Sequence, residues 1–213
     1  MPTTDLTQPV ESGIPTYPGD PPVSVEPHAT HDADGYRVSR LSLGSHAGTH
    51  VDAPSHTEAD GDDVDDLPVG RFAGDAVVAD CRGRAPRSAI GPEALPAADA
   101  DWLVVHTGWS GRWGDPSYRD HPYLTRDAAA FCVSQGYDLA VDALNPDPTP
   151  TDRAGPGEPD GVPAHRELLG AGRLVVENLA NLGAVPERFE LCVFPLKLAG
   201  GDGSPVRAVA RHD

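Results

Sequence analysis

The sequence predicts an α/β fold that is rich in strands and has a few short helices, in one domain spanning residues 1–213. Short apolar runs that end in charged or histidine residues are typical of buried strands. Two other stretches carry the capping signals of helices. The 23 glycines and 23 prolines are spread along the chain and indicate many turns rather than long helices.

Six segments are predicted to be strands. Arg37–Leu43 alternates apolar and polar residues, which is the period of a half-exposed strand. The other five are short apolar runs: Ala76–Asp80, Trp102–His106, Asp138–Asp142, Arg173–Glu177 and Leu191–Leu196. Strands therefore outnumber helices among the predicted elements.

Two segments are predicted to be helices. Thr125–Gln135 begins with a threonine suited to the N-cap, has Asp127 in its first turn and is followed by Gly136 as a stop signal. Val162–Gly170 has Pro163 near its first helical position and ends in glycine.

Two polar segments are predicted to be loops. Asn145–Pro163 is rich in proline, glycine and aspartate, and its length indicates a functional or flexible loop. Asp60–Asp66 is acidic but lacks the ligand spacing and terminal glutamate of an EF-hand, so it is interpreted as a solvated acidic surface.

The charge of the chain excludes some classes of partner. There are 33 acidic and 16 basic side chains, a formal charge of −17, and Lys197 is the single lysine. Such a surface repels phosphate backbones and anionic lipids, so neither nucleic acid nor a membrane is an expected partner. An aspartate-rich, lysine-poor surface also suits a salt-adapted cytoplasm, with an acidic protein of an ordinary cytoplasm as the alternative.

The sequence also predicts a cytoplasmic location. Met1 and Pro2 are followed by a polar segment without the pattern of a secretory signal. No apolar run approaches the roughly 20 residues that a membrane-spanning helix needs. Cys81, Cys132 and Cys192 are widely spaced and lie in or beside apolar stretches, so buried, reduced thiols are expected.

One segment of eleven residues concentrates potential metal ligands, namely His46, His50, Asp52 and His56. On a straight strand these side chains would point the same way, but the segment would span roughly 33 Å, too far for them to converge on one ion. The chain must therefore bend, and Gly48 and Pro54 are the residues that permit bends there.

Imidazole and carboxylate groups in this combination suit Zn, Mn, Fe, Co or Ni. The alternatives are a solvated polar loop, or histidines whose nitrogens are satisfied by backbone hydrogen bonds. His165 lies on the second predicted helix. Glu177 ends a predicted strand, where it is either a ligand or a simple strand boundary. His106 ends another strand and either lines a pocket or packs in the core.

The motif His46-x-Gly-Thr-His50-x-Asp52-x-Pro-x-His56 resembles the signature of the cyclase family of metal-dependent hydrolases, to which bacterial kynurenine formamidases and isatin hydrolases belong. Further segments resemble the family in order along the chain: Tyr17–Pro21, His165–Leu169 followed by Val175–Leu179, and Phe194–Leu198 followed by Gly203–Val209. The resemblance therefore runs nearly from end to end.

The resemblance implies a swivelling β/β/α fold, a homodimer or larger oligomer, and a site for two divalent cations, Zn²⁺ first and Mn²⁺ as the alternative. It implies that one ion is held by His46, His50 and Asp52. Asp52 would bridge to the second ion, which His165 binds, and Glu177 would contact both. The remaining motif residue, His56, would be the catalytic acid and base rather than a ligand.

The chemistry expected of such a site is hydrolysis of an amide. Divalent cations lower the pKa of a coordinated water from about 16 to about 7, and His56 would carry a proton from water to the leaving nitrogen. The resemblance favours an arylformamidase of tryptophan catabolism acting on N-formyl-L-kynurenine, with Tyr17 and Trp109 contacting an aromatic substrate. The alternatives are opening of a cyclic amide, imide or lactone, a non-catalytic metal- or ligand-binding protein, and an acidic interaction protein with incidental histidines.

Overall fold

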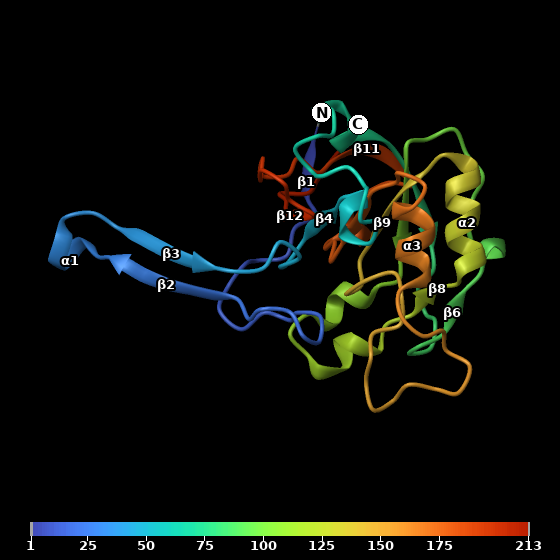
Figure 1. The fold of residues 1–213 in the computed structure, drawn as a ribbon, viewed down its shortest axis with the longest axis horizontal. Helices are drawn as coiled ribbons and strands as arrows, with labels where there is room; N and C mark the ends of the chain where they lie inside the picture. The colour runs from blue at the N-terminus through green and yellow to red at the C-terminus, as the bar shows by residue number, and fades with distance from the viewer. Residues whose placement is uncertain (1, 213) are drawn as a thin grey trace.

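The computed structural model describes residues 2–212 and is built on a curled, mixed sheet of nine strands (Figure 1). The order across the sheet is β1 (Thr3–Asp5), β13 (Val209–Arg211), β11 (Arg188–Cys192), β5 (Ala73–Asp80), β7 (Trp102–His106), β9 (Asp138–Val141), β10 (Val175–Glu177), β4 (His50–Asp52) and β12 (Gly203–Pro205). The four central strands, β5, β7, β9 and β10, are parallel, and the flanking strands are antiparallel to their neighbours.

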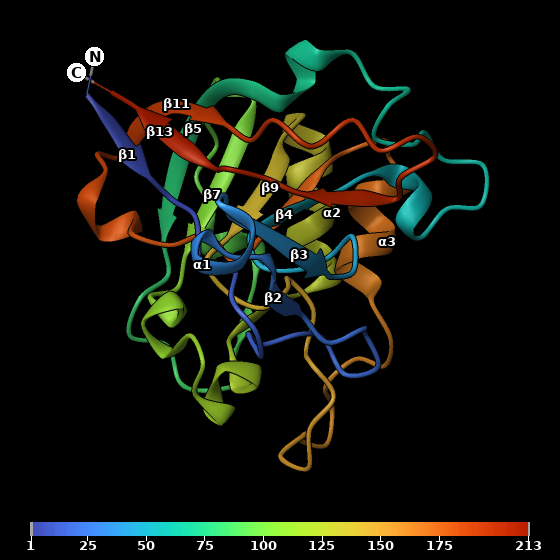
Figure 2. The ribbon, with the colours of Figure 1, turned by 90° about the vertical axis from the view of Figure 1, so that its left-hand side faces the viewer.

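The central strands are buried on both faces, so their sequences are apolar runs rather than alternating ones. On β7, Leu103 and Val105 face the helices α2 (Arg126–Gln135) and α3 (Pro163–Leu169), which lie side by side on one face (Figure 1). Trp102 and Val104 face the other core, which is enclosed where the sheet curls and β11 and β13 fold over it (Figure 2).

Five of the six predicted strands are confirmed, and the sixth is confirmed in part, because every predicted segment coincides with or overlaps a strand of the structure. The prediction for Leu191–Leu196 is wrong at its C-terminal half. β11 pairs with β5 from Arg188 to Cys192, and the chain then leaves the sheet. Phe194 and Leu196 are exposed, so this apolar run continues onto the surface instead of into a core.

Both predicted helices are confirmed with their capping. The Thr125 side chain accepts a hydrogen bond from the Ala128 backbone N–H, and Gly136 closes α2 in the left-handed conformation at φ +83°. The predicted loop Asn145–Pro163 contains no strand, and its only helical residue is Pro163, the first of α3. The three cysteines are free and buried, as expected.

The remaining elements are short. They are β6 (Ala89–Ile90), β8 (Tyr123–Leu124) and the single turns of 3₁₀ helix at Pro54–His56, Val69–Phe72, Pro92–Ala94, Trp109–Arg112, Pro116–Asp120 and Leu182–Ala184. No helix within residues 2–212 combines the length and apolarity that crossing a bilayer requires.

A hairpin projects from the body of the protein. It consists of β2 (Ser24–Ala29), α1 (His31–Asp34) and β3 (Val38–Ser42), and is called the arm below (Figure 1). All five residues of β3 are exposed. An isolated two-stranded hairpin is at best marginally stable in water, so packing against a partner would stabilise the arm.

Candidate active site

The register between β4 and β10 builds the centre of the site. The strands are antiparallel, and His50 lies opposite Glu177. Residues that pair across a ladder share a face, and so do residues two apart on one strand, so Asp52 points the same way as His50. This is the face that α3 covers, because Val175, which pairs with Asp52, packs in the core beneath the helices.

The bends expected at Gly48 and Pro54 are confirmed. Gly48 has φ +66°, and Pro54 opens a turn of 3₁₀ helix after the three residues of β4. The two bends bring the ends of the motif together, so that the rings of His46 and His56 lie with centroids 4.0 Å apart. The motif is therefore compact rather than extended over the length of a straight strand.

His165 reaches the same point from the first turn of α3. Its Nε2 lies 3.4 Å from Asp52 Oδ2 and 3.0 Å from Glu177 Oε1. On the other side of the ring, Nδ1 lies 2.7 Å from Asp147 Oδ2. The Asp147 carboxylate also accepts the backbone N–H groups of Ala164 and His165, so it caps α3 and orients the His165 ring at once.

Three groups of donor atoms lie close enough together to hold a cation: two of them share Asp52, and the third consists of His46, His56 and Asp202. In the first, Asp52 Oδ1 lies 2.7 Å from His46 Nδ1 and 3.2 Å from His50 Nε2. In the second, His165 and Glu177 face the other oxygen of Asp52. The ligating atoms of each group lie within 4.8 Å of one another. This arrangement has the donor types and proximity that a divalent cation requires.

Two oxygens of the second group are poorly satisfied. Asp52 Oδ2 and Glu177 Oε1 are buried, and within residues 2–212 neither accepts a hydrogen bond of good geometry, although His165 Nε2 lies close to both. Unsatisfied buried carboxylate oxygens are costly unless a ligand compensates them. The residues present therefore fit a divalent cation at this position.

The charges of the cluster are strongly coupled. Burial opposes protonation of His50 and His165, but the neighbouring carboxylates outweigh it and raise the pKa of each ring well above that of free histidine. Burial would raise the pKa of Asp52, but the positive charge of His50 and the hydrogen-bonding contacts of His165 and His46 hold that pKa well below its usual range. In the absence of a cation, the histidines and the carboxylates therefore stabilise one another's charged forms.

Three polar residues of the site were not predicted from the sequence. Asp147 holds His165, and Asp202 contacts the rings of both His46 and His56. Asn178 follows Glu177 in a left-handed conformation at φ +58°, and its Nδ2 donates to Gly48 O, which fixes the first bend of the motif. Asp202 directly precedes the segment at Gly203 that resembled the family, and this was the signal available for it.

A cavity of about 200 Å³ opens over the cluster. Its lining includes His46, His50, Asp52, His56, His165 and Glu177. The wall is completed by Tyr17, Asp20, Leu144, Asn145, Val162 and Asn178. The structure thus places Tyr17, which was predicted to contact substrate, at the same cavity as the predicted ligands.

Trp109 does not line this cavity. It is buried in a small cluster with Tyr118, Ala143 and Leu144, and its Nε1 donates to the Tyr118 carbonyl. Its link to the cavity runs through Leu144, which does line it. His106 borders a different cavity of about 590 Å³ at the ends of β5 and β7, which none of the six predicted catalytic and ligand residues lines.

Comparisons with known proteins identify the family of the chain. Residues 4–148 match the Cyclase family model, described as "Putative cyclase". The kynurenine formamidase of Salinibacter ruber is 32% identical over 216 residues, covering 99% of this chain and 98% of that protein.

Solved structures of isatin hydrolases are similar to this chain over nearly its whole length. The crystal structure of an isatin hydrolase bound to the product analogue thioisatinate is similar with a TM-score of 0.84 at 26% identity, covering 98% of this chain and 91% of that chain. Isatin hydrolase A from Ralstonia solanacearum gives a TM-score of 0.85 at 27% identity with the same coverage. The likeness confirms the strand-rich α/β fold, and the chain belongs to the cyclase family of hydrolases.

Proposed function

We propose that this chain is a divalent-metal-dependent amidohydrolase, and specifically an arylformamidase that cleaves the formamide of N-formyl-L-kynurenine or a similar aromatic amide. The observation that carries the proposal is the convergence of six chemically suited side chains on one cavity, from β4, β10, α3 and the bends of one motif. The relatives named kynurenine formamidase support the choice of substrate.

In this proposal the two donor groups that share Asp52 hold two cations, Zn²⁺ or alternatively Mn²⁺. His46, His50 and Asp52 hold the first, and His165, Asp52 and Glu177 hold the second. Bound divalent cations would supply a water of lowered pKa and polarise the scissile carbonyl. The carboxylates of Asp52 and Glu177 offset the positive charge that such cations bring into a buried site.

His56 is proposed as the catalytic acid and base. Its side chain is 32% exposed where it lines the cavity, so it has access to both water and substrate. It accepts a proton from the attacking water and donates it to the leaving nitrogen, which departs as a neutral amine. Asp52 and Glu177, by contrast, are buried and held by histidines, which suits them to fixed roles as ligands.

The cavity is suited to a small aromatic substrate. A cavity of about 150 Å³ holds a benzene ring, so the available 200 Å³ takes one ring with a compact substituent. Tyr17 and Leu144 supply aromatic and aliphatic surface on the wall. In this proposal Tyr17 contacts the substrate directly, and Trp109 supports the Leu144 side of the wall from behind.

A second candidate reaction is the opening of a cyclic amide such as isatin. The observation that favours it is the likeness to isatin hydrolases over nearly the whole chain. Initial rates on N-formyl-L-kynurenine and on isatin, with the same Zn²⁺ loading, separate the two. Faster turnover of the formyl substrate supports the arylformamidase. Turnover of isatin alone would replace it with the second reaction.

We further propose that the protein is a homodimer in which the arm of each copy packs on the other. One groove on the body is lined by Val64, Asp65, Leu67, Val69, Phe72, Phe194, Pro195 and Lys197. Within residues 2–212, the large exposed apolar side chains other than Val10 lie on the arm (Tyr36, Val38 and Leu41), in the lining of this groove (Val69 and Phe194) or next to its lining residues in the sequence (Leu196 and Leu198). Such concentrated apolar exposure indicates an interface.

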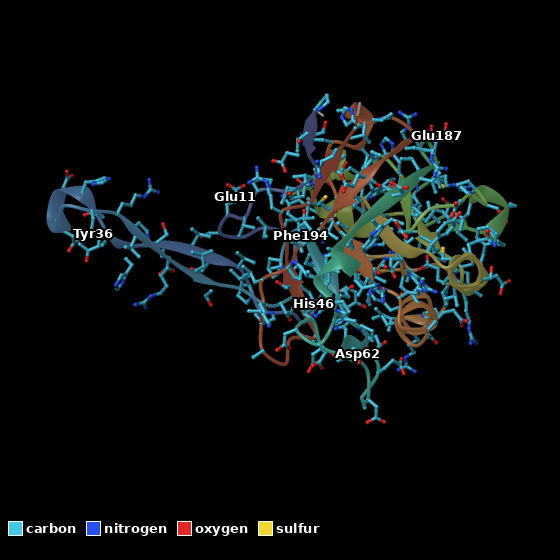
Figure 3. All side chains as sticks on the ribbon, turned by 90° about the horizontal axis from the view of Figure 1, so that it is seen from above. Glu11, Tyr36, His46, Asp62, Glu187 and Phe194 are labelled. Carbon is cyan, nitrogen blue, oxygen red and sulfur yellow. The ribbon has the colours of Figure 1, made fainter. Side chains whose placement is uncertain are left out.

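Geometry favours a second copy as the occupant of the groove. The arm carries charges of both signs, Arg37 and Arg40 against Glu26, Asp32 and Asp34, so charge does not select the occupant. Figure 3 shows Tyr36 at the tip of the arm, far from Phe194 on the body, so the tip does not reach its own groove. Two copies can exchange arms reciprocally, as a two-fold interface requires.

The acidic surface outside the site is proposed to be an adaptation to a salty cytoplasm. Asp52 and Glu177 belong to the site, but the segment Asp60–Asp66 lies on a loop where most side chains reach solvent. Salt screens the repulsion among such charges. The free energy of unfolding is therefore expected to rise with added KCl. A protein that is fully stable in dilute buffer would contradict this.

A further inference from the structure

One carboxylate links a proposed metal ligand to the proposed catalytic base. Asp202 Oδ2 lies 2.9 Å from His46 Nε2 and 3.4 Å from His56 Nδ1, and both contacts have hydrogen-bond geometry. An ionised carboxylate only accepts hydrogen bonds, so each of these ring nitrogens must carry the proton. We propose that Asp202 is a positioning residue that sets the tautomers of both histidines.

For His46, this leaves the correct atom free to bind a cation. In the metal-free structure both ring nitrogens of His46 face a carboxylate, Nδ1 that of Asp52 and Nε2 that of Asp202. A cation would replace the proton on Nδ1, and Asp202 would keep the one on Nε2, which leaves a neutral ring with its lone pair on Nδ1. Nδ1 is the atom that faces Asp52 Oδ1, at 2.7 Å, within the first donor group. A carboxylate that accepts the outer N–H of a ligating histidine fixes its ring orientation and raises its basicity.

For His56, the same carboxylate selects the tautomer that is less common in free histidine, which prefers its proton on Nε2. With Nδ1–H held by Asp202, Nε2 lies on the opposite edge of the ring and carries the lone pair. His56 lines the cavity, so its unprotonated nitrogen is available there as a base. Carboxylates in hydrolytic triads orient the base histidine in the same way.

Asp202 is itself held in place. Its Oδ1 accepts a hydrogen bond from Ser45 Oγ at 2.9 Å, and its backbone carbonyl accepts one from Ala53 N at 2.9 Å. The next residue is glycine because a Cβ at Gly203 would lie 2.7 Å from His46 Cε1 and 2.9 Å from the carbonyl oxygen of Val51. The loop before β12 is therefore fitted closely against the His46 ring.

This inference rests on the proposed catalytic role of His56, but its first test does not require activity. The full-length, metal-free protein, labelled with ¹⁵N-histidine, is examined by NMR from neutral to alkaline pH, and tautomers are compared where the His56 signals no longer change with pH. His56→Gln identifies the His56 signals. The wild type is expected to show the Nδ1–H tautomer at His56, and Asp202→Ala is expected to convert it largely to Nε2–H. An unchanged His56 tautomer in Asp202→Ala would overturn the inference.

A kinetic measurement separates positioning from general folding effects. With saturating Zn²⁺, Asp202→Ala should bind as many ions as the wild type and should lose about 10- to 100-fold in kcat with little change in KM. Asp202→Asn should recover part of the loss, because its amide oxygen still accepts one hydrogen bond. Asp62→Ala removes the same charge from the exposed acidic loop and should leave both the tautomer and kcat unchanged.

The outcomes also distinguish this inference from the proposed function. A tautomer change in Asp202→Ala, together with a wild type that hydrolyses no aromatic amide, would sustain the role of Asp202 and reject the arylformamidase. Loss of a bound ion in Asp202→Ala at saturating Zn²⁺ would make Asp202 a metal ligand and overturn the positioning role.

Discussion

His50 Nε2 lies 3.3 Å from Glu177 Oε2, across two neighbouring antiparallel strands whose register places the two residues opposite each other. The pair joins the two donor groups that share Asp52, because His50 belongs to the first and Glu177 to the second. Strand register, which is set by the buried valines on either side, thereby determines the spacing of the proposed metal ligands.

Glu177→Gln is expected to weaken cation binding. The substitution keeps the size of the side chain but removes the negative charge and one anionic oxygen from a buried site. We expect a loss of Zn²⁺ affinity beyond the about 10- to 100-fold typical for residues outside the ligand set, measured by titration of the metal-free protein. Glu187→Gln, at an exposed position, is the matched control. Equal affinities for the two variants would contradict the assignment of Glu177.

His56→Gln is expected to separate binding from catalysis. The variant should keep its metal content, because His56 lies outside both ligand groups proposed for the cations. Its turnover of an aromatic formamide should fall by about 10²- to 10⁴-fold, the range for loss of a general acid–base group. Metal analysis and initial rates are measured on the same preparation, with His28→Gln on the arm as the control. Loss of metal from His56→Gln would show that His56 is a ligand.

Cation binding is expected to depend on pH. Burial opposes protonation of His46, His50 and His165, but the adjoining carboxylates raise the pKa of all three in the metal-free protein. A cation must displace these protons, so its apparent affinity should increase with pH and binding should release protons. Calorimetric titrations with Zn²⁺ in two buffers of different ionisation enthalpy count the protons. Binding without proton release would contradict the prediction.

The same shifts predict how the metal-free fold responds to pH. A histidine with a raised pKa in the folded state contributes stability below its unfolded pKa of about 6.5. That contribution is lost as the pH rises through the folded value. The free energy of unfolding of the metal-free protein should therefore decline above about pH 6.5, and saturating Zn²⁺ should remove the decline. Urea titrations across this range provide the test.

Asp147→Ala is expected to destabilise the protein and loosen His165. The substitution leaves the Ala164 and His165 backbone N–H groups and His165 Nδ1 without their acceptor. Each unsatisfied buried donor costs about 1–3 kcal/mol, so denaturant unfolding should report a loss of at least that size. Asp160→Ala in the same loop is exposed and should have little effect. A stability equal to that of the control would exclude the capping role.

Tyr36→Ser combined with Leu41→Ser is expected to shift the protein from dimer to monomer. Both side chains are more than half exposed on the arm, at 58% and 56%, so the substitutions should leave the fold of each copy intact. Light scattering during gel filtration measures the mass directly. A wild type that is monomeric at micromolar concentration, or a variant that remains dimeric, would contradict the arm exchange.

Much of the fold was predictable because its signals are local. Capping residues marked α2, and apolar runs marked the buried strands. The prediction for Leu191–Leu196 failed in part because apolarity alone does not distinguish a core strand from an exposed apolar surface, such as the one beside the groove where Phe194 lies. The projection of the arm was not predictable, since Arg37–Leu43 carries the same alternation whether its apolar residues meet the body or a partner.

The candidate site was predictable to the extent that its residues cluster in sequence. Four potential ligands within eleven residues are a local signal, and the family resemblance added His165 and Glu177. Asp202 was missed because its partner His46 is 156 residues away. The family-like segment that begins at Gly203 marks its neighbourhood but does not indicate that contact. Asp147 lies in a segment predicted to be a loop. Its capping of α3 depends on how that loop folds back against the first turn of the helix, which the sequence does not indicate.

The measurement that tests the central claim most directly is metal analysis of the purified protein together with hydrolysis of N-formyl-L-kynurenine. The proposed function predicts two divalent cations per chain, a rate that disappears on chelation and returns with Zn²⁺ or Mn²⁺, and loss of both cations and rate in Asp52→Ala. A protein that binds no divalent cation tightly, or that hydrolyses the substrate equally well after chelation, would contradict it.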